Sequence, residues 1–328
     1  MRSVSCPACD RQGGAAVIET DVPGLGKVRL VRCARCGMGY LDPQPEPDEI
    51  APFYASEYYG GSGTKFVATV ERMRSAMAKR RARRLARGLP PGARVLDVGC
   101  GDGRLLEAFA ALGFRGVGTE RAGRRPRALT SQSDIEVLAG DLTTTGLEPG
   151  QFDLGVFWHV LEHLHDPLAS LQEAARVLRP GGRLVVAVPN LDSFQARWTG
   201  RSWFHLDLPR HLFHFTPGSL TALLSRAGFR VEHVGHFSFE QNPFGILQSA
   251  LNRLGGGGAP VNRLYETLKG NTAGARAAGR LAARAAYWLG MPPATLLATL
   301  ESLVRRGGTI EAWAERAGDA PADRQEAR

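Results

Sequence analysis

The pattern of apolar and polar positions predicts an α/β domain in the middle of the chain. Short apolar runs at 95–98, 116–120, 135–138, 152–158 and 183–188 are separated by turns and by stretches with helical spacing. Runs of this length with helices between them are typical of parallel strands in one sheet. A capped helix is predicted to begin at Thr216-Pro217 and to end at Gly228, before two more strands at 229–239 and 309–314. The pattern therefore predicts seven strands.

The first apolar run ends in a glycine-rich turn that also contains acidic residues. Asp97 is followed by Gly99, Gly101 and Gly103 at alternate positions. Glycines at this spacing let the backbone bend sharply and approach a ligand closely, because a side chain there would collide with it. The G-x-G-x-x-G fingerprint of dinucleotide-binding enzymes needs one more glycine at position 104, which is an arginine here. The turn therefore indicates a small-molecule cofactor and argues against a dehydrogenase.

The run 95–103 resembles the first motif of the class I S-adenosylmethionine-dependent methyltransferases, in their type 11/12-like form. Glu120 ends the second strand about twenty residues later, where doubly wound folds bind ribose hydroxyls. Asp141 and Leu142 follow the third strand, and the resemblance places Asp141 at the adenine amine. The resemblance implies a Rossmann-like, doubly wound, seven-stranded α/β sheet with an antiparallel seventh strand, and S-adenosylmethionine as cofactor. Its expected binding residues are Asp97, Gly99, Gly101, Gly103, Glu120, Asp141 and Leu142.

Four of the five cysteines form two Cys-x-x-Cys pairs near the start of the chain: Cys6 with Cys9, and Cys33 with Cys36. Two such turns can place four thiolates tetrahedrally around Zn²⁺. A segment this short has too small an apolar core to be stable alone, and a bound metal would stabilise it. Disulfides are the alternative, which a reducing compartment disfavours. We therefore predict a structural zinc ribbon with no open position for catalysis.

A long segment separates the sixth predicted strand from the seventh, although members of this family usually join them by a short connection. We expect residues 243–306 to be a helical insertion. Arg276, Arg280 and Arg284 are four residues apart in it and share one helical face. Its apolar positions lie on another face: Leu281, Ala285, Trp288 and Leu289. This division fits a helix lying on an anionic membrane surface, and it also fits a helix packed on the sheet.

The composition suits a large folded domain with a basic surface. Of 328 residues, 43% are hydrophobic, and the formal net charge of +9 leaves nucleic acid, anionic lipid and phosphorylated substrates open. The first ten residues lack the apolar core of a secretory signal. Pro292-Pro293 is expected to break the apolar segment 285–300, which is too short to span a membrane. We therefore expect a cytoplasmic protein, with peripheral membrane contact through 243–306.

These observations divide the chain into five predicted parts. Residues 1–42 form the zinc ribbon, and 43–90 form a linker and a helical lid whose aromatic residues 53–59 fold over the cofactor. Residues 91–242 form the methyltransferase core and 243–306 the insertion. Residues 307–328 contain the last core strand and a tail.

Two histidine clusters are candidates for the chemistry. Methyl transfer from a sulfonium is an in-line displacement, so a hydroxyl or carbon-acid acceptor needs a nearby base to remove its proton. His163 lies in the segment 159–163 after the fourth strand, which edges the active site in similar enzymes, including ubiquinone-pathway O-methyltransferases. His211 lies in the second cluster, 205–214, after the fifth strand, at the edge of the sheet where α/β folds bind ligands. We predict His163 and His211 as the catalytic residues.

The favoured function is methyl transfer to a small-molecule or glycan acceptor, namely a sugar nucleotide, a polysaccharide or a lipid-linked compound. The preference rests on similarity to sugar C-methyltransferases, in which a zinc ribbon also precedes the catalytic domain. An RNA methyltransferase is a less favoured alternative, because the fourth strand lacks the Asn/Asp-Pro-Pro-aromatic turn and no Pro-Cys nucleophile is present. A non-catalytic, membrane-docking zinc-ribbon module on this scaffold is the third hypothesis.

Overall fold

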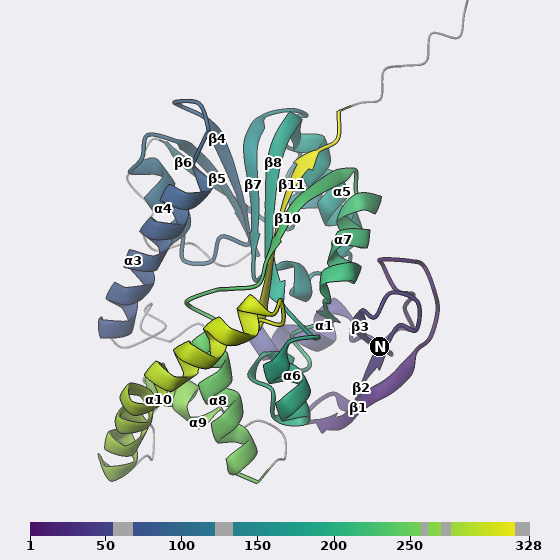
Figure 1. Cartoon of the computed structure of the whole chain (residues 1–328). Coiled ribbons are helices and arrows are strands. Elements are labelled where there is room, and N and C mark those ends of the chain that lie inside the picture. The colour runs from purple at the N-terminus through teal and green to yellow at the C-terminus, as the bar shows by residue number, and fades with distance from the viewer. Residues whose placement is uncertain (55–67, 122–133, 257–261, 270–276, 319–328) are drawn as a thin grey trace, which may run out of the picture.

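The computed structural model describes residues 1–54, 68–121, 134–256, 262–269 and 277–318. A large twisted sheet with helices on both faces forms the centre of the molecule (Figure 1). A small sheet near the N-terminus and a group of helices lie at the same end of it, below the large sheet in Figure 1. The part of the chain that the structure describes contains no helix long and apolar enough to cross a membrane.

The large sheet has seven strands in the order β10-β11-β8-β7-β4-β5-β6. Parallel pairing joins β8, β7, β4, β5 and β6, whereas β11 is antiparallel to both of its neighbours. This confirms the predicted Rossmann-like α/β fold with an antiparallel last strand. The strands are β4 (Arg94–Val98), β5 (Arg115–Glu120), β6 (Ile135–Ala139), β7 (Phe152–Trp158), β8 (Leu178–Pro189), β10 (Phe229–Gly235) and β11 (Thr309–Arg316).

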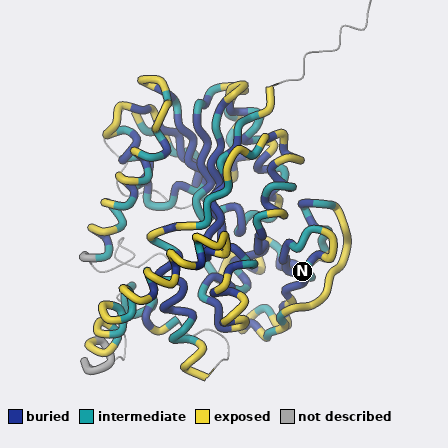
Figure 2. Tube along the Cα trace, in the orientation of Figure 1, coloured by how far each residue is buried: buried dark blue, intermediate teal, exposed yellow. Residues whose placement is uncertain are grey.

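Alternate residues of the central strands bury into two separate cores, one on each face of the sheet. Val95 packs with Leu85 of α3 (Ala68–Leu85) and Phe109 of α4 (Arg104–Ala110). Leu96 packs on the other face, in the core that includes α5 (Pro167–Val177) and α7 (Pro217–Arg226). Figure 2 shows these strands buried along most of their length. The predicted cap of α7 is confirmed, because Thr216 Oγ1 accepts a hydrogen bond from the Ser219 N–H.

The sheet order reverses between β4 and β7, and both strands end at the same edge. Doubly wound folds bind ligands outside the carboxyl ends of the strands at such a switch point. One predicted boundary is wrong: the sixth strand, expected over 229–239, ends at Gly235. Residues 236–241 instead form a loop that reaches this edge, and Phe239 and Glu240 line the cavity there.

The small sheet contains β1 (Ala15–Val22), β2 (Gly26–Arg32) and β3 (Gly39–Leu41). Its fourth strand, β9 (Phe213–His214), comes from the core segment that carries the second histidine cluster. Gly39 pairs with His214, and Tyr40 pairs with Phe213. The short helices α1 (Pro47–Ile50) and η1 (Ala51–Tyr54) then lead from this sheet toward the core. Backbone hydrogen bonds between β3 and β9 therefore join the N-terminal unit to the core.

The segment between β10 and β11 is helical, with α8 (Asn242–Leu254), α9 (Arg263–Leu268) and α10 (Ala277–Leu303). The predicted break at Pro292-Pro293 is wrong, because α10 continues through both prolines. These prolines remove the hydrogen bonds to the carbonyls of Trp288 and Leu289. Both of those residues are exposed. Leu264, Ala294 and their neighbours form a separate small core beneath the helix. Shorter elements complete the chain: η2 (Leu142–Thr144), η3 (Leu161–His163), α6 (Phe194–Thr199), η4 (Gly200–Ser202) and η5 (Phe204–Leu206).

Candidate active site

The glycine turn after β4 has the backbone that the sequence predicts. Gly99, Gly101 and Gly103 all have positive φ, at 66°, 60° and 80°, a region that other residues rarely enter. A Cβ on Gly99 would lie 2.6 Å from Cγ2 of Val160, in the turn after β7. The turn therefore packs directly against the neighbouring strand end, and only glycine fits this contact.

Two predicted cofactor acids, Asp97 of β4 and Glu120 of β5, lie next to this turn. Glu120, at the end of β5, accepts hydrogen bonds from the backbone N–H groups of Gly101 at 2.7 Å and Arg121 at 3.2 Å. Asp97 is buried, and burial raises its pKa to about 7, with an opposing effect from Arg81. Both carboxylates line the central cavity together with Gly99, Gly101, Asp141 and Leu142. The structure thus brings together six of the seven predicted cofactor residues, and Gly103 begins α4 behind them.

Arg81 of α3 reaches the floor of this cavity, which the sequence analysis did not predict. Its guanidinium carbon lies 3.8 Å from the ring centroid of Trp158, and it forms an ion pair with Glu240 from the loop after β10. Arg84 pairs with Glu311, and Arg74 pairs with Asp102 at 3.1 Å. Several basic side chains of α3 therefore form ion pairs within the protein. Seven basic residues lie on this helix, and the sequence carries no signal for which of them turns inward.

The two predicted histidine clusters meet at the end of β7. The rings of His163 and His211 lie 4.6 Å apart between centroids, and the rings of His159 and His205 stack at 6.4 Å. His159 has a positive φ of 55°, which is uncommon for a side chain of this size. Backbone strain of this kind clusters at functional sites. Residues that are about fifty positions apart in the chain therefore form one imidazole group.

Hydrogen bonds fix which nitrogen of each central imidazole carries the proton. Nδ1 of His211 lies 2.8 Å from the carbonyl of His205, and Nδ1 of His163 lies 2.9 Å from that of Arg210. A carbonyl only accepts, so each Nδ1 donates and each Nε2 keeps its lone pair. Burial lowers the pKa of His163, and it lowers that of His211 well below its usual value. Both rings are therefore neutral near pH 7, and Nε2 of His211 lies 3.7 Å from a carboxylate oxygen of Asp207.

Glu162 lies beside these two rings with a buried carboxylate. Burial raises its pKa to about 7, and Nδ1 of His159 lies 3.3 Å from its Oε1. One nitrogen of His163, one of His211 and a Glu162 oxygen all lie within 4.8 Å of one another. Donors of these types can bind a cation as well as accept a proton. Glu162 is a residue that sequence reasoning left without a role.

Tyr54 covers part of this group from the N-terminal side. Its hydroxyl lies 3.1 Å from Nδ1 of His163, and the guanidinium of Arg121 lies 4.1 Å from its ring centroid. Tyr54 belongs to the predicted aromatic lid, whose place over the cofactor stays a prediction. Tyr58, Tyr59 and Gly60–Gly63, on which the rest of that prediction depends, lie outside the described residues.

One cavity of about 800 Å³ connects all these features. It extends from the glycine turn past the imidazole group to aromatic side chains of the insertion. There, Phe204 of η5 packs edge to face on two aromatic side chains of the insertion, Phe244 at 5.3 Å and Tyr265 at 5.4 Å. Trp288 and Met291 of α10 complete this end. The volume is in the upper part of the range of small-molecule sites, roughly 300–1,000 Å³.

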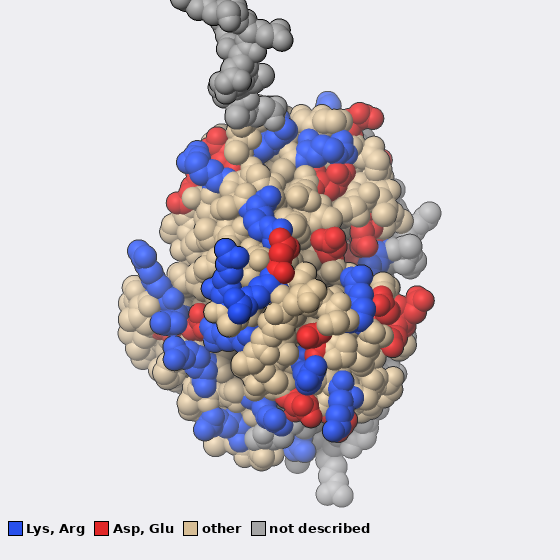
Figure 3. All heavy atoms as spheres, turned by 90° about the vertical axis from the view of Figure 1, so that its right-hand side faces the viewer, with Lys and Arg blue, Asp and Glu red and all other residues tan. Residues whose placement is uncertain are grey.

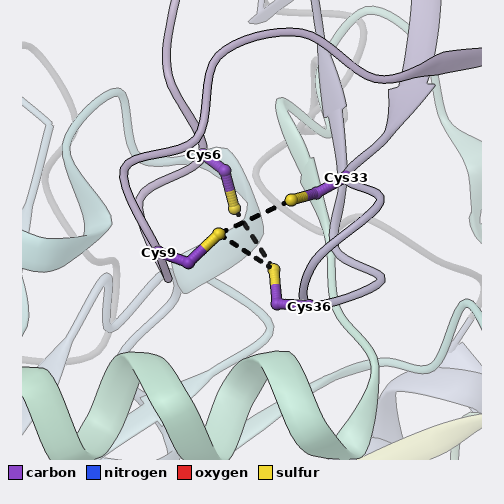
Figure 4. Close-up of side chains that lie close together, drawn as sticks. All are labelled: Cys6, Cys9, Cys33 and Cys36. Carbon is purple, nitrogen blue, oxygen red and sulfur yellow. Dashed lines mark hydrogen bonds between the residues drawn. The ribbon is translucent and has the colours of Figure 1, made fainter.

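The four N-terminal cysteines converge on one point (Figure 4). Their Sγ atoms lie 3.3 Å apart for Cys6 and Cys36, 3.5 Å for Cys9 and Cys33, and 3.8 Å for Cys9 and Cys36. All four are free thiols rather than disulfides. Four sulfurs bound tetrahedrally to Zn²⁺ at ~2.3 Å are ~3.8 Å apart, close to these distances. The donor set therefore fits the predicted zinc ribbon.

A doubly wound sheet with a glycine turn at its switch point and acids at successive strand ends defines a nucleoside-binding α/β enzyme. A family model described as a methyltransferase domain matches residues 69–234. The ubiquinone biosynthesis O-methyltransferase of Xanthomonas campestris pv. campestris (strain B100) is 33% identical over 167 residues, covering 47% of this chain and 70% of that protein. The enzyme of the same name from Xanthomonas oryzae pv. oryzae (strain PXO99A) is 32% identical over 161 residues, covering 45% and 67%.

The chain belongs to the class I S-adenosylmethionine-dependent methyltransferases, which confirms the family, the cofactor and the enzymatic activity inferred from the sequence. The 1,6-didemethyltoxoflavin-N1-methyltransferase of Burkholderia thailandensis has a similar fold, with a TM-score of 0.50 and 16% sequence identity. That similarity covers 91% of this chain and 99% of the other.

Proposed function

We propose that the enzyme methylates an oxygen of a small-molecule or glycan acceptor that carries an apolar part, with lipid-linked compounds as the favoured class. The observation that carries this proposal is the continuous cavity, which has the cofactor acids at one end and aromatic side chains of the insertion at the other. The relatives named as ubiquinone biosynthesis O-methyltransferases support transfer to oxygen. An acceptor with a polar reacting end and an apolar remainder matches a cavity that is acidic at the cofactor end and aromatic at the other end.

The proposed mechanism assigns separate tasks to the two ends of the site. Asp97, Glu120 and Asp141, with the glycine turn, hold S-adenosylmethionine, whose sulfonium supplies the methyl group. His163 and His211 line the cavity and each binds a carbonyl through Nδ1, so Nε2 is the atom of each ring that can receive the hydroxyl proton as the oxygen attacks. The buried surroundings exclude water, which favours transfer to the acceptor over side reactions.

An RNA acceptor has less support. Arg74, Arg81 and Arg84, three of the seven basic residues of α3, contact acids within the protein, which leaves fewer side chains of this helix for a phosphate backbone. Figure 3 shows one face of the molecule on which lysine and arginine side chains are interspersed with acidic and uncharged ones. A phosphate backbone is best bound by a continuous basic track. We therefore retain the small-molecule class and assign the ribbon cysteines to a structural Zn²⁺.

The test is transfer of label from S-adenosylmethionine with a deuterated methyl group to a total lipid extract and, separately, to a water-soluble extract. We expect a labelled product in the lipid fraction, read by mass spectrometry, and a loss of at least 100-fold in rate for His211→Ala with cofactor affinity retained. Label in the water-soluble fraction alone would refute the lipid-linked class. Label in RNA alone would refute the small-molecule class.

A further inference from the structure

Helix α10 presents an uninterrupted apolar face to solvent. Between Ala285 and Val304 the exposed positions include no charged residue, and Thr299 is their one polar member. Trp288, Leu289, Leu296 and Leu303 are 67%, 77%, 63% and 75% exposed. Exposed apolar patches of this extent mark binding surfaces, because a monomer in water rarely leaves so many large side chains uncovered.

The exposed side chains lie on one side of the helix, and the opposite side is buried. Ala294 and Ala298 face inward and pack against Ile246 and Leu247 of α8. The acidic residue of the helix, Glu301, is also buried, where it accepts a hydrogen bond from the Gln195 side chain. Figures 1 and 2 show α10 running along the outside of the molecule, with much of its length exposed. Packing on the main sheet, the alternative reading of this amphipathic pattern, therefore does not account for the apolar face.

Basic residues border the two ends of this face. Arg284 is exposed just before it, and Arg305 and Arg306 are exposed just after it. Arg284 and Arg305 are 21 positions apart, which corresponds to about 30 Å along a helix. Arginines at both ends of an apolar face match a bilayer surface with anionic headgroups, in which each basic residue adds roughly 1 kcal/mol of attraction. An apolar protein partner would not require this charge arrangement.

The apolar face is also continuous with the acceptor cavity. Trp288 is exposed and at the same time lines the cavity, and Phe239 from the loop after β10 is 48% exposed and lines it too. A lipid-linked acceptor could therefore pass from a bilayer into the aromatic end of the site without crossing water.

From these observations we infer that α10 docks the enzyme on an anionic membrane, lying in the plane of the surface with residues 285–304 inserted among the headgroups. The inference deepens the proposed function, because it supplies the route by which a lipid-linked acceptor reaches the site.

The experiment is flotation of the full-length protein with vesicles of equal parts phosphatidylcholine and phosphatidylglycerol, and with phosphatidylcholine alone. We expect the protein to float with the anionic vesicles and at least tenfold less with the neutral ones. The variant Leu289→Glu/Leu296→Glu/Leu303→Glu should lose at least tenfold of the anionic binding. The control Val17→Glu/Leu112→Glu places acids at exposed apolar positions far from α10 and should bind like the wild type.

Calorimetric titration with S-adenosylhomocysteine shows that the variants are folded, since the substitutions leave the cofactor residues untouched. Failure of the wild type to float, or equal flotation of the α10 variant, overturns the inference. A wild-type dimer in sedimentation that the α10 variant converts to a monomer, without vesicle binding, identifies the face as a subunit interface and also overturns it. The vesicles contain no acceptor, so docking and methyl transfer succeed or fail independently in these tests.

Discussion

Oε2 of Glu120 lies 2.7 Å from the backbone nitrogen of Gly101, so the acid at the end of β5 holds the glycine turn at the end of β4. The same carboxylate lines the cavity, where doubly wound folds bind ribose hydroxyls. One side chain thus shapes the cofactor turn and faces the ligand.

Glu120→Ala should weaken cofactor binding strongly. It removes hydrogen bonds to a charged group, which are worth about 1.5–3 kcal/mol each, so affinity for S-adenosylhomocysteine should fall at least tenfold in calorimetry. Glu120→Gln keeps an acceptor oxygen for the Gly101 N–H and should lose less. Wild-type affinity in the alanine variant would show that Glu120 does not contact the cofactor.

Affinity for S-adenosylmethionine should rise with pH between 6 and 8. Burial raises the pKa of Asp97 to about 7, so its carboxylate is roughly 10% ionised at pH 6 and roughly 90% at pH 8. The cofactor carries positive charge at its sulfonium and amino groups and prefers the ionised acid, so affinity should increase several-fold over this range. Asp97→Asn should bind more weakly at pH 8 and show a flatter profile. Parallel pH profiles for the two proteins would contradict this assignment.

Gly99→Ala should abolish cofactor binding and lower the melting temperature. The new Cβ would meet Val160 at 2.6 Å and would also occupy the left-handed region. Gly113→Ala is the matched control, since Gly113 has φ +84° but open space around its Cβ position. The free energy of unfolding of the control should fall by only roughly 1–2 kcal/mol, which is the cost of a left-handed backbone at alanine, and its cofactor affinity should not change. Equal losses of cofactor affinity would mean that the contact with Val160 is unimportant.

Cys33→Ser should remove zinc and destabilise the protein. The wild type is expected to contain one Zn²⁺ per chain by elemental analysis, and the variant much less, with a lower melting temperature. Cys100→Ser alters the cysteine outside the cluster, so its zinc content should equal that of the wild type. Zinc-free wild-type protein with an unchanged melting temperature would refute the structural role.

Much of the fold could be predicted because it depends on local patterns. The strand-turn-helix around Asp97 and the acid at Glu120 are encoded in residues adjacent in sequence, and the structure reproduces both. The capped helix after Thr216 is predictable for the same reason. The inward turn of Arg81 onto Trp158 and its pairing with Glu240 depend on tertiary packing between segments far apart in the chain, for which one sequence carries no periodic signal.

The continuity of α10 is a feature for which a local sequence pattern predicted the wrong structure. A proline pair disfavours a helix interior, and the sequence argument correctly recognised that cost. The helix persists because its inner side packs on α8, which is information that only the tertiary structure provides.

Strand β9 belongs at once to the cysteine-bearing sheet and to the segment that carries His211 and His214. Deleting the first 42 residues would therefore leave β9 without its partner β3, next to the histidines proposed to activate the acceptor. We therefore expect a domain without residues 1–42 to be less active than the full chain. If the four cysteines bind Zn²⁺ as proposed, loss of the metal would reach the histidines through this shared sheet without any ion touching the substrate.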